Sequence, residues 1–195
     1  MKKSRITKRR TVASGKFLSL ELLEYKDEEG QCRQWEAVQR VGSRHAAVII
    51  AQMQTGGEIL LIRQYRPALD SYVLEFPAGL IDPEEDAKQC ALRELREETG
   101  YYGEFRRMLP PAASSAGLCS ELLSLVFVSI DENKPENQNP QPEMQDGECI
   151  QSFLVHPQKL ADFVEARLLA GDVLDSRLAA WMNGDKSLCP ERATL

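Results

Sequence analysis

The chain has 195 residues, and 30 acidic against 24 basic side chains give it a formal net charge of −6. The length suits one ordinary domain or at most two small ones, while 43% apolar and 28% charged residues are typical of a soluble globular protein and exclude a disordered one. No apolar run approaches the roughly 18 residues of a membrane span, and the acidic excess argues against nucleic acid as a partner, because phosphate binding usually shows as net positive charge.

Strand patterns dominate the first half of the chain. Six basic residues lie among the first ten, and we expect them to form a solvated, partly frayed end, with a phosphate-seeking arm as the alternative. Residues 17–22 alternate between apolar and polar side chains as in a strand, and residues 35–41 are expected to return as the second strand of a hairpin that reverses at 28–30. Further strands are expected at residues 46–53, 58–65, 73–76, 122–130 and 149–155.

Helical patterns are fewer. Residues 83–99 form one long helical pattern, and residues 157–169 and 176–182 form shorter amphipathic ones. Residues 131–147 are polar and rich in proline and asparagine, which indicates a long surface loop of the kind that is often functional. Strands scattered between few helices predict an α+β fold, a sandwich with a mixed sheet, and not a doubly wound parallel sheet.

The cysteines are scattered and odd in number, and none lies in a Cys-x-x-Cys pair, which argues against zinc binding. We expect reduced thiols in a cytoplasmic protein, and the basic first residues lack the apolar stretch that a secretory signal would need. The cysteines are Cys32, Cys90, Cys119, Cys149 and Cys189.

The helix expected at residues 83–99 has clear end signals. Asp82 can cap its start, Pro83 suits the first helical position, and Glu85 stands three residues after the cap as in a capping box. Gly100 supplies the stop signal.

Three glutamates of this helix occupy unusual positions. At about 100° per residue, Glu94 and Glu98 fall inside the apolar stripe that should face the core, and Glu97 lies at its edge. Core-facing carboxylates are costly unless they are paired or bind a metal, and Mg²⁺ or Mn²⁺ prefers oxygen ligands of this kind. Arg93, one turn before Glu97, is placed to orient it, and the alternative is a purely internal arginine–glutamate network.

These residues match the pattern G-x5-E-x7-R-E-U-x-E-E-x-G-U, where U is a bulky apolar residue, so the chain resembles the Nudix hydrolases. The resemblance implies a Nudix fold, an α/β/α sandwich with a mixed sheet, and hydrolysis of a nucleoside diphosphate linked to another group. Most of the chain is similar to one branch, the ADP-ribose pyrophosphatases and nucleoside-diphosphate-sugar hydrolases. The matching segments are residues 15–17, 35–36, 63–67, 75–82 and 146–148, in addition to the box at 79–101.

The resemblance implies roles for the acidic residues. Glu94 and Glu98 would be the principal ligands of Mg²⁺, with Mn²⁺ as the alternative, and the Ala78 carbonyl would add a backbone ligand. Glu97 would be a further ligand or a base, and Gly79 would keep the backbone open beside the metal. The matching acid of the loop, Glu148, would act as general base.

The resemblance also implies how the nucleotide is held. Phe17 and Trp35 would sandwich the base across two subunits of a homodimer, and Glu36 would read the base edge. Residues 1–44 would then form an N-terminal strand region for dimerisation and base binding, and residues 45–195 the Nudix domain. By the same resemblance, Arg66 would hold a phosphate bidentately, with Arg40 as a second candidate, and Gly117 would belong to the substrate-binding loop.

The leading hypothesis is metal-dependent hydrolysis of ADP-ribose to AMP and ribose 5-phosphate. One departure favours other nucleoside diphosphate sugars such as GDP-mannose: Ala116 stands where the ADP-ribose branch often has proline. A different alternative is a Nudix-like module that senses such a ligand without cutting it, although that module should lose box acids and this chain keeps them. A purely structural interaction protein would leave the core-facing glutamates unexplained.

Overall fold

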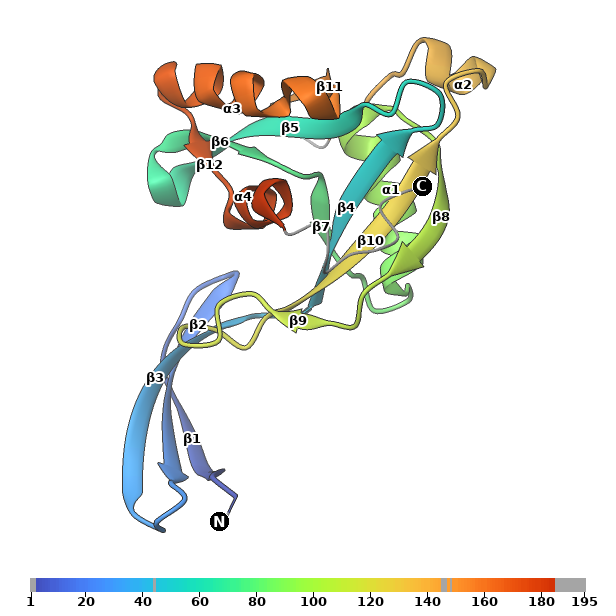
Figure 1. The fold of residues 1–195 in the computed structure, drawn as a ribbon. Helices are drawn as coiled ribbons and strands as arrows, with labels where there is room; N and C mark the ends of the chain where they lie inside the picture. The colour runs from blue at the N-terminus through green and yellow to red at the C-terminus, as the bar shows by residue number, and fades with distance from the viewer. Residues whose placement is uncertain (1–2, 44, 145–146, 148, 185–195) are drawn as a thin grey trace.

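The chain forms a small antiparallel sheet that projects as an arm from a larger body of sheet and helices (Figure 1). The computed structural model describes residues 3–43, 45–144, 147 and 149–184. The arm consists of β1 (Arg5–Ser14), β2 (Leu18–Lys26) and β3 (Cys32–Arg40). The strands of the body are β4 (His45–Met53), β5 (Ile59–Arg66), β6 (Ser71–Glu75), β7 (Ala78–Leu80), β8 (Gly103–Met108), β9 (Ala112–Ala113), β10 (Leu122–Ile130), β11 (Ile150–Val155) and β12 (Val173–Leu174). The helices are α1 (Ala87–Thr99), α2 (Pro135–Gln138), α3 (Leu160–Leu169) and α4 (Ser176–Asn183), with short 3-10 turns η1 (Pro67–Leu69) and η2 (Pro157–Lys159).

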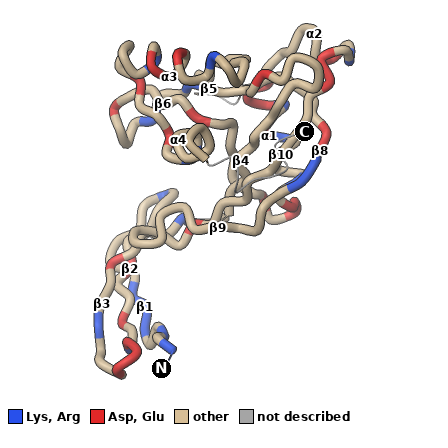
Figure 2. Tube along the Cα trace, viewed as in Figure 1, with Lys and Arg blue, Asp and Glu red and all other residues tan. Residues whose placement is uncertain are grey.

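Strand β1 corrects the expectation for the basic N-terminus. It pairs antiparallel with β2 from Arg5, opposite Lys26, to Ser14, opposite Ser19. Every residue of β1 is exposed, and Figure 2 shows basic residues, in blue, along this strand of the arm. The ladder to β2 satisfies the backbone while the charges remain in water. Within the first ten residues, the expectation of a frayed end is therefore wrong from residue 5 onward, while the expected exposure to solvent is confirmed.

The body is a mixed sheet between two helical layers. Strand β4 pairs parallel with β10, and β10 pairs antiparallel with β8. Because successive side chains of a strand point to opposite faces, β4 contributes to two cores. Its Val48 and Ile50 pack in the cluster that includes α3 and α4, whereas Ala47 and Ile49 pack in the cluster that includes α1. The expected α+β sandwich with a mixed sheet and additional N-terminal antiparallel strands is confirmed.

Helix α1 begins four residues later than its cap signals suggested. The capping box is Asp86 with Gln89: the Gln89 N–H donates to the Asp86 carboxylate, and the Asp86 N–H donates to the Gln89 side chain, both at 2.8 Å. Two candidate caps stand in series, and the second forms the reciprocal pair. The expected start at residue 83 is therefore wrong, while Gly100 ends the helix with φ of 78° as expected.

The loop after β10 packs onto the end of α1. A side-chain carbon at Gly100 would lie 2.4 Å from the backbone nitrogen of Gln141, and the Glu143 N–H donates to the Glu97 carbonyl at 2.8 Å. Gly100 is thus required by close packing as well as by its dihedral angle. Elsewhere, no helix of the described residues is long and apolar enough to cross a membrane.

Candidate functional site

A cleft of about 640 Å³ opens between the sheet, the box helix α1 and helix α4. Carboxylates and guanidinium groups share its walls. The acids are Glu75, Asp82, Glu94, Glu98 and Glu121, and the arginines are Arg40, Arg66, Arg93 and Arg177. The structure therefore brings together residues that are up to 137 positions apart in the chain, from Arg40 to Arg177.

Two of the predicted metal ligands lie in this cleft beside the β7 backbone. Glu98 is buried, with 5% of its surface exposed, and its carboxylate accepts the Ala78 N–H at 3.1 Å. Glu94 is half-buried one turn earlier on the same face of α1. Both positions follow from the helical period that placed these acids on the core-facing stripe.

Gly79 provides the space that Glu94 occupies. A side-chain carbon at position 79 would lie 1.8 Å from Glu94 Oε1 and 2.0 Å from its carboxyl carbon. No substituent fits at that distance, so the glycine lets the carboxylate lie against the strand backbone. This agrees with the expectation that Gly79 keeps the backbone open beside the metal position.

Arg93 joins the acids of α1 and of the preceding turn. Its guanidinium group donates to Glu85 at 2.5 Å, to Glu94 at 2.8 Å and to Glu97 at 3.1 Å. The hydrogen bond from Arg93 holds the pKa of Glu85 below its ordinary value, and the bond to Glu85 raises the pKa of Arg93. Arg93 thus orients Glu97, as expected, and an internal arginine–glutamate network exists beside the two cleft carboxylates.

The donor set fits a hard divalent cation in its chemistry. The carboxylates of Glu94 and Glu98 line the cleft with the backbone of Ala78, and oxygen ligands of this kind suit Mg²⁺ or Mn²⁺. Within the described residues, no three acidic, histidine or cysteine side chains are already gathered around a common point. Glu97 points to Arg93, and the predicted base Glu148 lies outside the described residues.

The cleft arginines are held by acids that lie deeper in the protein. Arg66 donates from Nε to Glu75 at 2.8 Å, and 40% of the Arg66 side chain is exposed against 5% of Glu75. Arg40 pairs with Glu121 in the same way, with the arginine as the more exposed partner. Burial raises the pKa of Glu75, and the hydrogen bond from Arg66 opposes that rise. In both pairs the arginine is therefore the more exposed partner, and all four side chains line the cleft.

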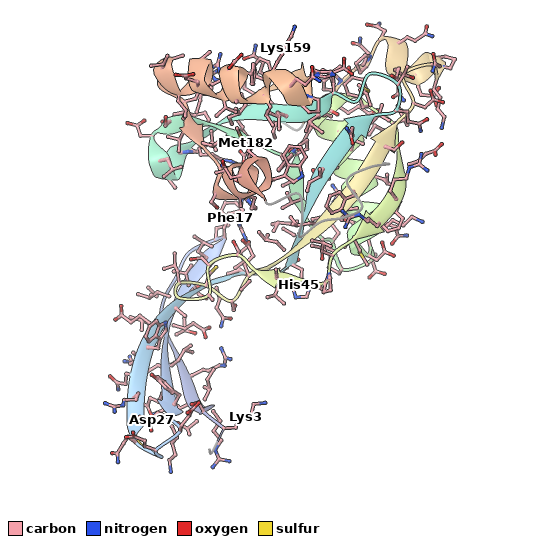
Figure 3. The ribbon with its side chains drawn as sticks, viewed as in Figure 1. Lys3, Phe17, Asp27, His45, Lys159 and Met182 are labelled. Atoms are coloured by element: carbon pink, nitrogen blue, oxygen red, sulfur yellow. The ribbon has the colours of Figure 1, made fainter. Side chains whose placement is uncertain are left out.

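The predicted base-binding residues lie on or near the arm and do not meet within one chain. Trp35 is 49% exposed and is therefore not a core residue, and its Nε1 donates to the Gly117 carbonyl at 3.1 Å. Phe17 is 67% exposed, and Figure 3 shows it at the end of the arm nearest the body. Trp35 pairs with Leu23, six residues from Phe17, which corresponds to about 20 Å along a strand. Glu36 is exposed on β3 next to Trp35.

Sequence patterns did not point to Arg177 or Glu75 as cleft residues. Glu75 ends a short apolar strand, and Arg177 lies in the first turn of an amphipathic helix. Neither position carries a local signal of binding, since an arginine on a helix is most often a surface charge. Only the packing of α4 against β6 shows that both residues line the cleft.

Comparison with known proteins adds independent findings. A family model described as the NUDIX domain matches residues 43–174. The ADP-ribose pyrophosphatase of Saccharomyces cerevisiae is 36% identical over 171 residues, which cover 84% of this chain and 74% of that protein. The ADP-sugar pyrophosphatase of Mus musculus is 36% identical over 153 residues, 75% of this chain and 70% of that protein. A crystal structure of an ADP compounds hydrolase superposes with a TM-score of 0.59 at 24% identity, covering 87% of this chain and 90% of that one.

Proposed function

The chain belongs to the Nudix family, and from that premise we propose that it hydrolyses ADP-ribose to AMP and ribose 5-phosphate in the cleft beside α1. The observation that carries this proposal is that one cleft is lined both by carboxylates from α1 and by guanidinium groups from the strands and α4. A diphosphate needs both, because a cation must neutralise its charge and donors must hold its oxygens. Relatives named as ADP-ribose and ADP-sugar pyrophosphatases support this substrate class.

Glu94, Glu98 and the Ala78 carbonyl would hold the divalent cation in this proposal, with Glu97 as a further ligand or a base. The cation, when bound, neutralises phosphate charge and makes a water molecule more acidic. The oxygen of that water bonds to one phosphorus, the bridging P–O bond breaks, and the bridging oxygen leaves with one of the two phosphates. We assign to Glu148 the removal of the water proton, by its match to the loop acid of similar hydrolases.

Substrate contacts follow the cleft and the arm. We assign phosphate binding to Arg66 and Arg40, which line the cleft. Trp35 and Phe17 would stack on the adenine and Glu36 would read its edge, with Gly117 held beside Trp35. Residues 1–44 would serve this role and dimerisation, and residues 45–195 would form the catalytic domain.

A homodimer would explain how two separated aromatic rings could stack on one base. Phe17 and Trp35 lie about 20 Å apart on the ladder of one arm, so a single chain cannot close both rings on one base. A second copy of the chain could bring its own arm and supply the other ring. Sedimentation should then give twice the mass of the chain, and a monomer that still discriminates adenine would contradict the shared pocket.

Four free cysteines among the described residues support a reducing, cytoplasmic location.

The second candidate substrate is GDP-mannose. Ala116 stands in the segment beside Trp35 where the ADP-ribose branch often has a proline, and a residue without the fixed φ of proline allows another loop path.

The deciding experiment is turnover of a nucleotide-sugar panel with Mg²⁺. We expect ADP-ribose to give AMP and ribose 5-phosphate, and the Glu98→Gln variant, prepared in parallel, to exclude a contaminating hydrolase. Fast turnover of GDP-mannose without turnover of ADP-ribose would replace the leading substrate. Binding of ADP-ribose without turnover of any compound would instead identify a sensing module.

A further inference from the structure

Arg177 lies in the main cleft although it belongs to the C-terminal helix. It is the second residue of α4, two residues after the cap Asp175. The match to the family model ends at residue 174, before α4 begins. The cleft that contains it also contains Arg66, Glu94 and Glu98.

Two carboxylates fix the position of the Arg177 guanidinium. Nε and Nη2 donate to the two oxygens of Asp175, at 2.8 Å and 2.5 Å. Nη2 also lies 4.0 Å from Glu75 Oε2, while the other oxygen of Glu75 accepts from Arg66. Glu75 therefore stands between two arginines, one from β5 and one from α4, and links them into one cluster.

The burial of this cluster is asymmetric. The exposed fraction is 34% for the Arg177 side chain and 12% for Asp175, and 40% for Arg66 against 5% for Glu75. The two carboxylates are thus less exposed than the two arginines, and Arg66, Glu75 and Arg177 line the cleft together. The two bonds to Asp175 use two of the five N–H groups of an arginine. An anion in the cleft would meet directed N–H donors whose rotamers are already fixed, which reduces the entropy lost on binding.

We propose that Arg177 is a substrate-binding residue that, together with Arg66, holds oxygens of the substrate diphosphate, with Glu75 and Asp175 as positioning residues. The ligand class is a nucleoside diphosphate, and for this class the proposal rests on the proposed function. Arginine suits the role because its planar fork can bind a phosphate bidentately. The alternative is that Arg177 only ties α4 to β6.

The test measures binding of α,β-methylene-ADP, a diphosphate that cannot be hydrolysed at its bridge, with adenosine as the ligand without phosphate. Calorimetry with Mg²⁺ should show that Arg177→Ala weakens binding of the diphosphate by about tenfold or more, as expected when a hydrogen bond to a charged group is lost. Binding of adenosine should stay as in the wild type. Arg106→Ala is the matched control, because Arg106 is 42% exposed and ion-paired but lies on β8 outside the cleft lining.

The Arg177→Lys variant gives a second test in case Arg177→Ala fails to fold. It keeps the charge but loses the fork that pairs with Asp175, so diphosphate binding should still be weaker than in the wild type. Wild-type affinity of both Arg177 variants for α,β-methylene-ADP, or an equal loss for adenosine, would overturn the proposal. If the wild type cleaves no nucleotide sugar but its binding of α,β-methylene-ADP depends on Arg177, the proposed role of Arg177 in diphosphate binding is supported and the proposed hydrolase function fails.

Discussion

The substitution Gly79→Ala should separate folding from activity. Gly79 is in strand β7, where its φ is not in the left-handed region, so alanine can adopt the backbone conformation. The three atoms nearest to the added carbon all belong to the Glu94 side chain: Oε1 at 1.8 Å, the carboxyl carbon at 2.0 Å and Cγ at 2.4 Å. A flexible side chain can move away, so the fold should survive with a change of about 1 kcal/mol or less in the free energy of unfolding.

The substitution should instead displace the Glu94 carboxylate. Ordinary contact begins near 3.4 Å, so Glu94 Oε1 must shift by roughly 1.6 Å from its place against the strand, and the misplacement of a reacting group by about 1 Å can cost 100-fold in rate. If Glu94 is a metal ligand, the half-saturating concentration of Mg²⁺ should rise as well. We expect kcat/KM for ADP-ribose to fall by about 100-fold or more.

The assay compares Gly79→Ala with Gly56→Ala, which is a matched control. A side-chain carbon at Gly56 would meet Glu58 Oε2 at 2.0 Å, which is the same kind of clash, but in the turn between β4 and β5. Both variants should melt near the wild-type temperature, and only Gly79→Ala should lose turnover. Wild-type kcat/KM and Mg²⁺ dependence in Gly79→Ala would refute the reasoning that Glu94 must lie against the β7 backbone.

Three further predictions concern Glu98, Glu85 and the metal requirement. Glu98→Gln keeps an oxygen for the Ala78 N–H, so the fold should persist while turnover falls by about 100-fold or more, and turnover near the wild-type rate would exclude Glu98 as a metal ligand. Glu85→Gln should lower the free energy of unfolding at pH 7 by about 1–2 kcal/mol; because Arg93 lowers the pKa of Glu85 from 4.5, this contribution is complete above pH 4.5 and lost as the pH falls through the folded-state value. Urea titrations at pH 7 and pH 3 measure it, and a difference that does not shrink in acid would contradict the assignment. Chelation with EDTA should abolish turnover and excess Mg²⁺ should restore it, whereas turnover that persists in EDTA would contradict the metal requirement.

The part of the site that can be predicted from sequence is the part that depends on the local helical period. The 100° rotation per residue places Glu94 and Glu98 on the face of α1 that meets the sheet, and the structure has them in the cleft. Gly100 was predictable for a similar reason, since an αL residue after a helix is usually glycine. These inferences need only the geometry of one helix.

The start of α1 was harder to predict, because two local cap signals were equally good. Asp82 with Glu85 and Asp86 with Gln89 are both acceptable caps for the same helix. The structure uses Asp86 as the cap, while Glu85 accepts the Asp82 N–H at 3.0 Å and also pairs with Arg93, eight residues away. Strand β1 was missed for a related reason, because exposure and positive charge describe the side chains of residues 5–14 and do not reveal the ladder that their backbone forms with β2.

The resemblance pointed to Arg66 and Arg40, but the place of Arg177 in the cleft could not be predicted from the sequence because it is made by tertiary packing. Arg66 ends β5 and Arg177 begins α4, and they approach each other only because both pack around Glu75 at the end of β6. A buried carboxylate without partners would be costly; Glu75 accepts a hydrogen bond from Arg66 and lies 4.0 Å from Arg177, and all three residues line the cleft. The same pairing that stabilises the fold therefore contributes to the proposed anion-binding surface, and α4 is part of the proposed site as well as a cover for the sheet.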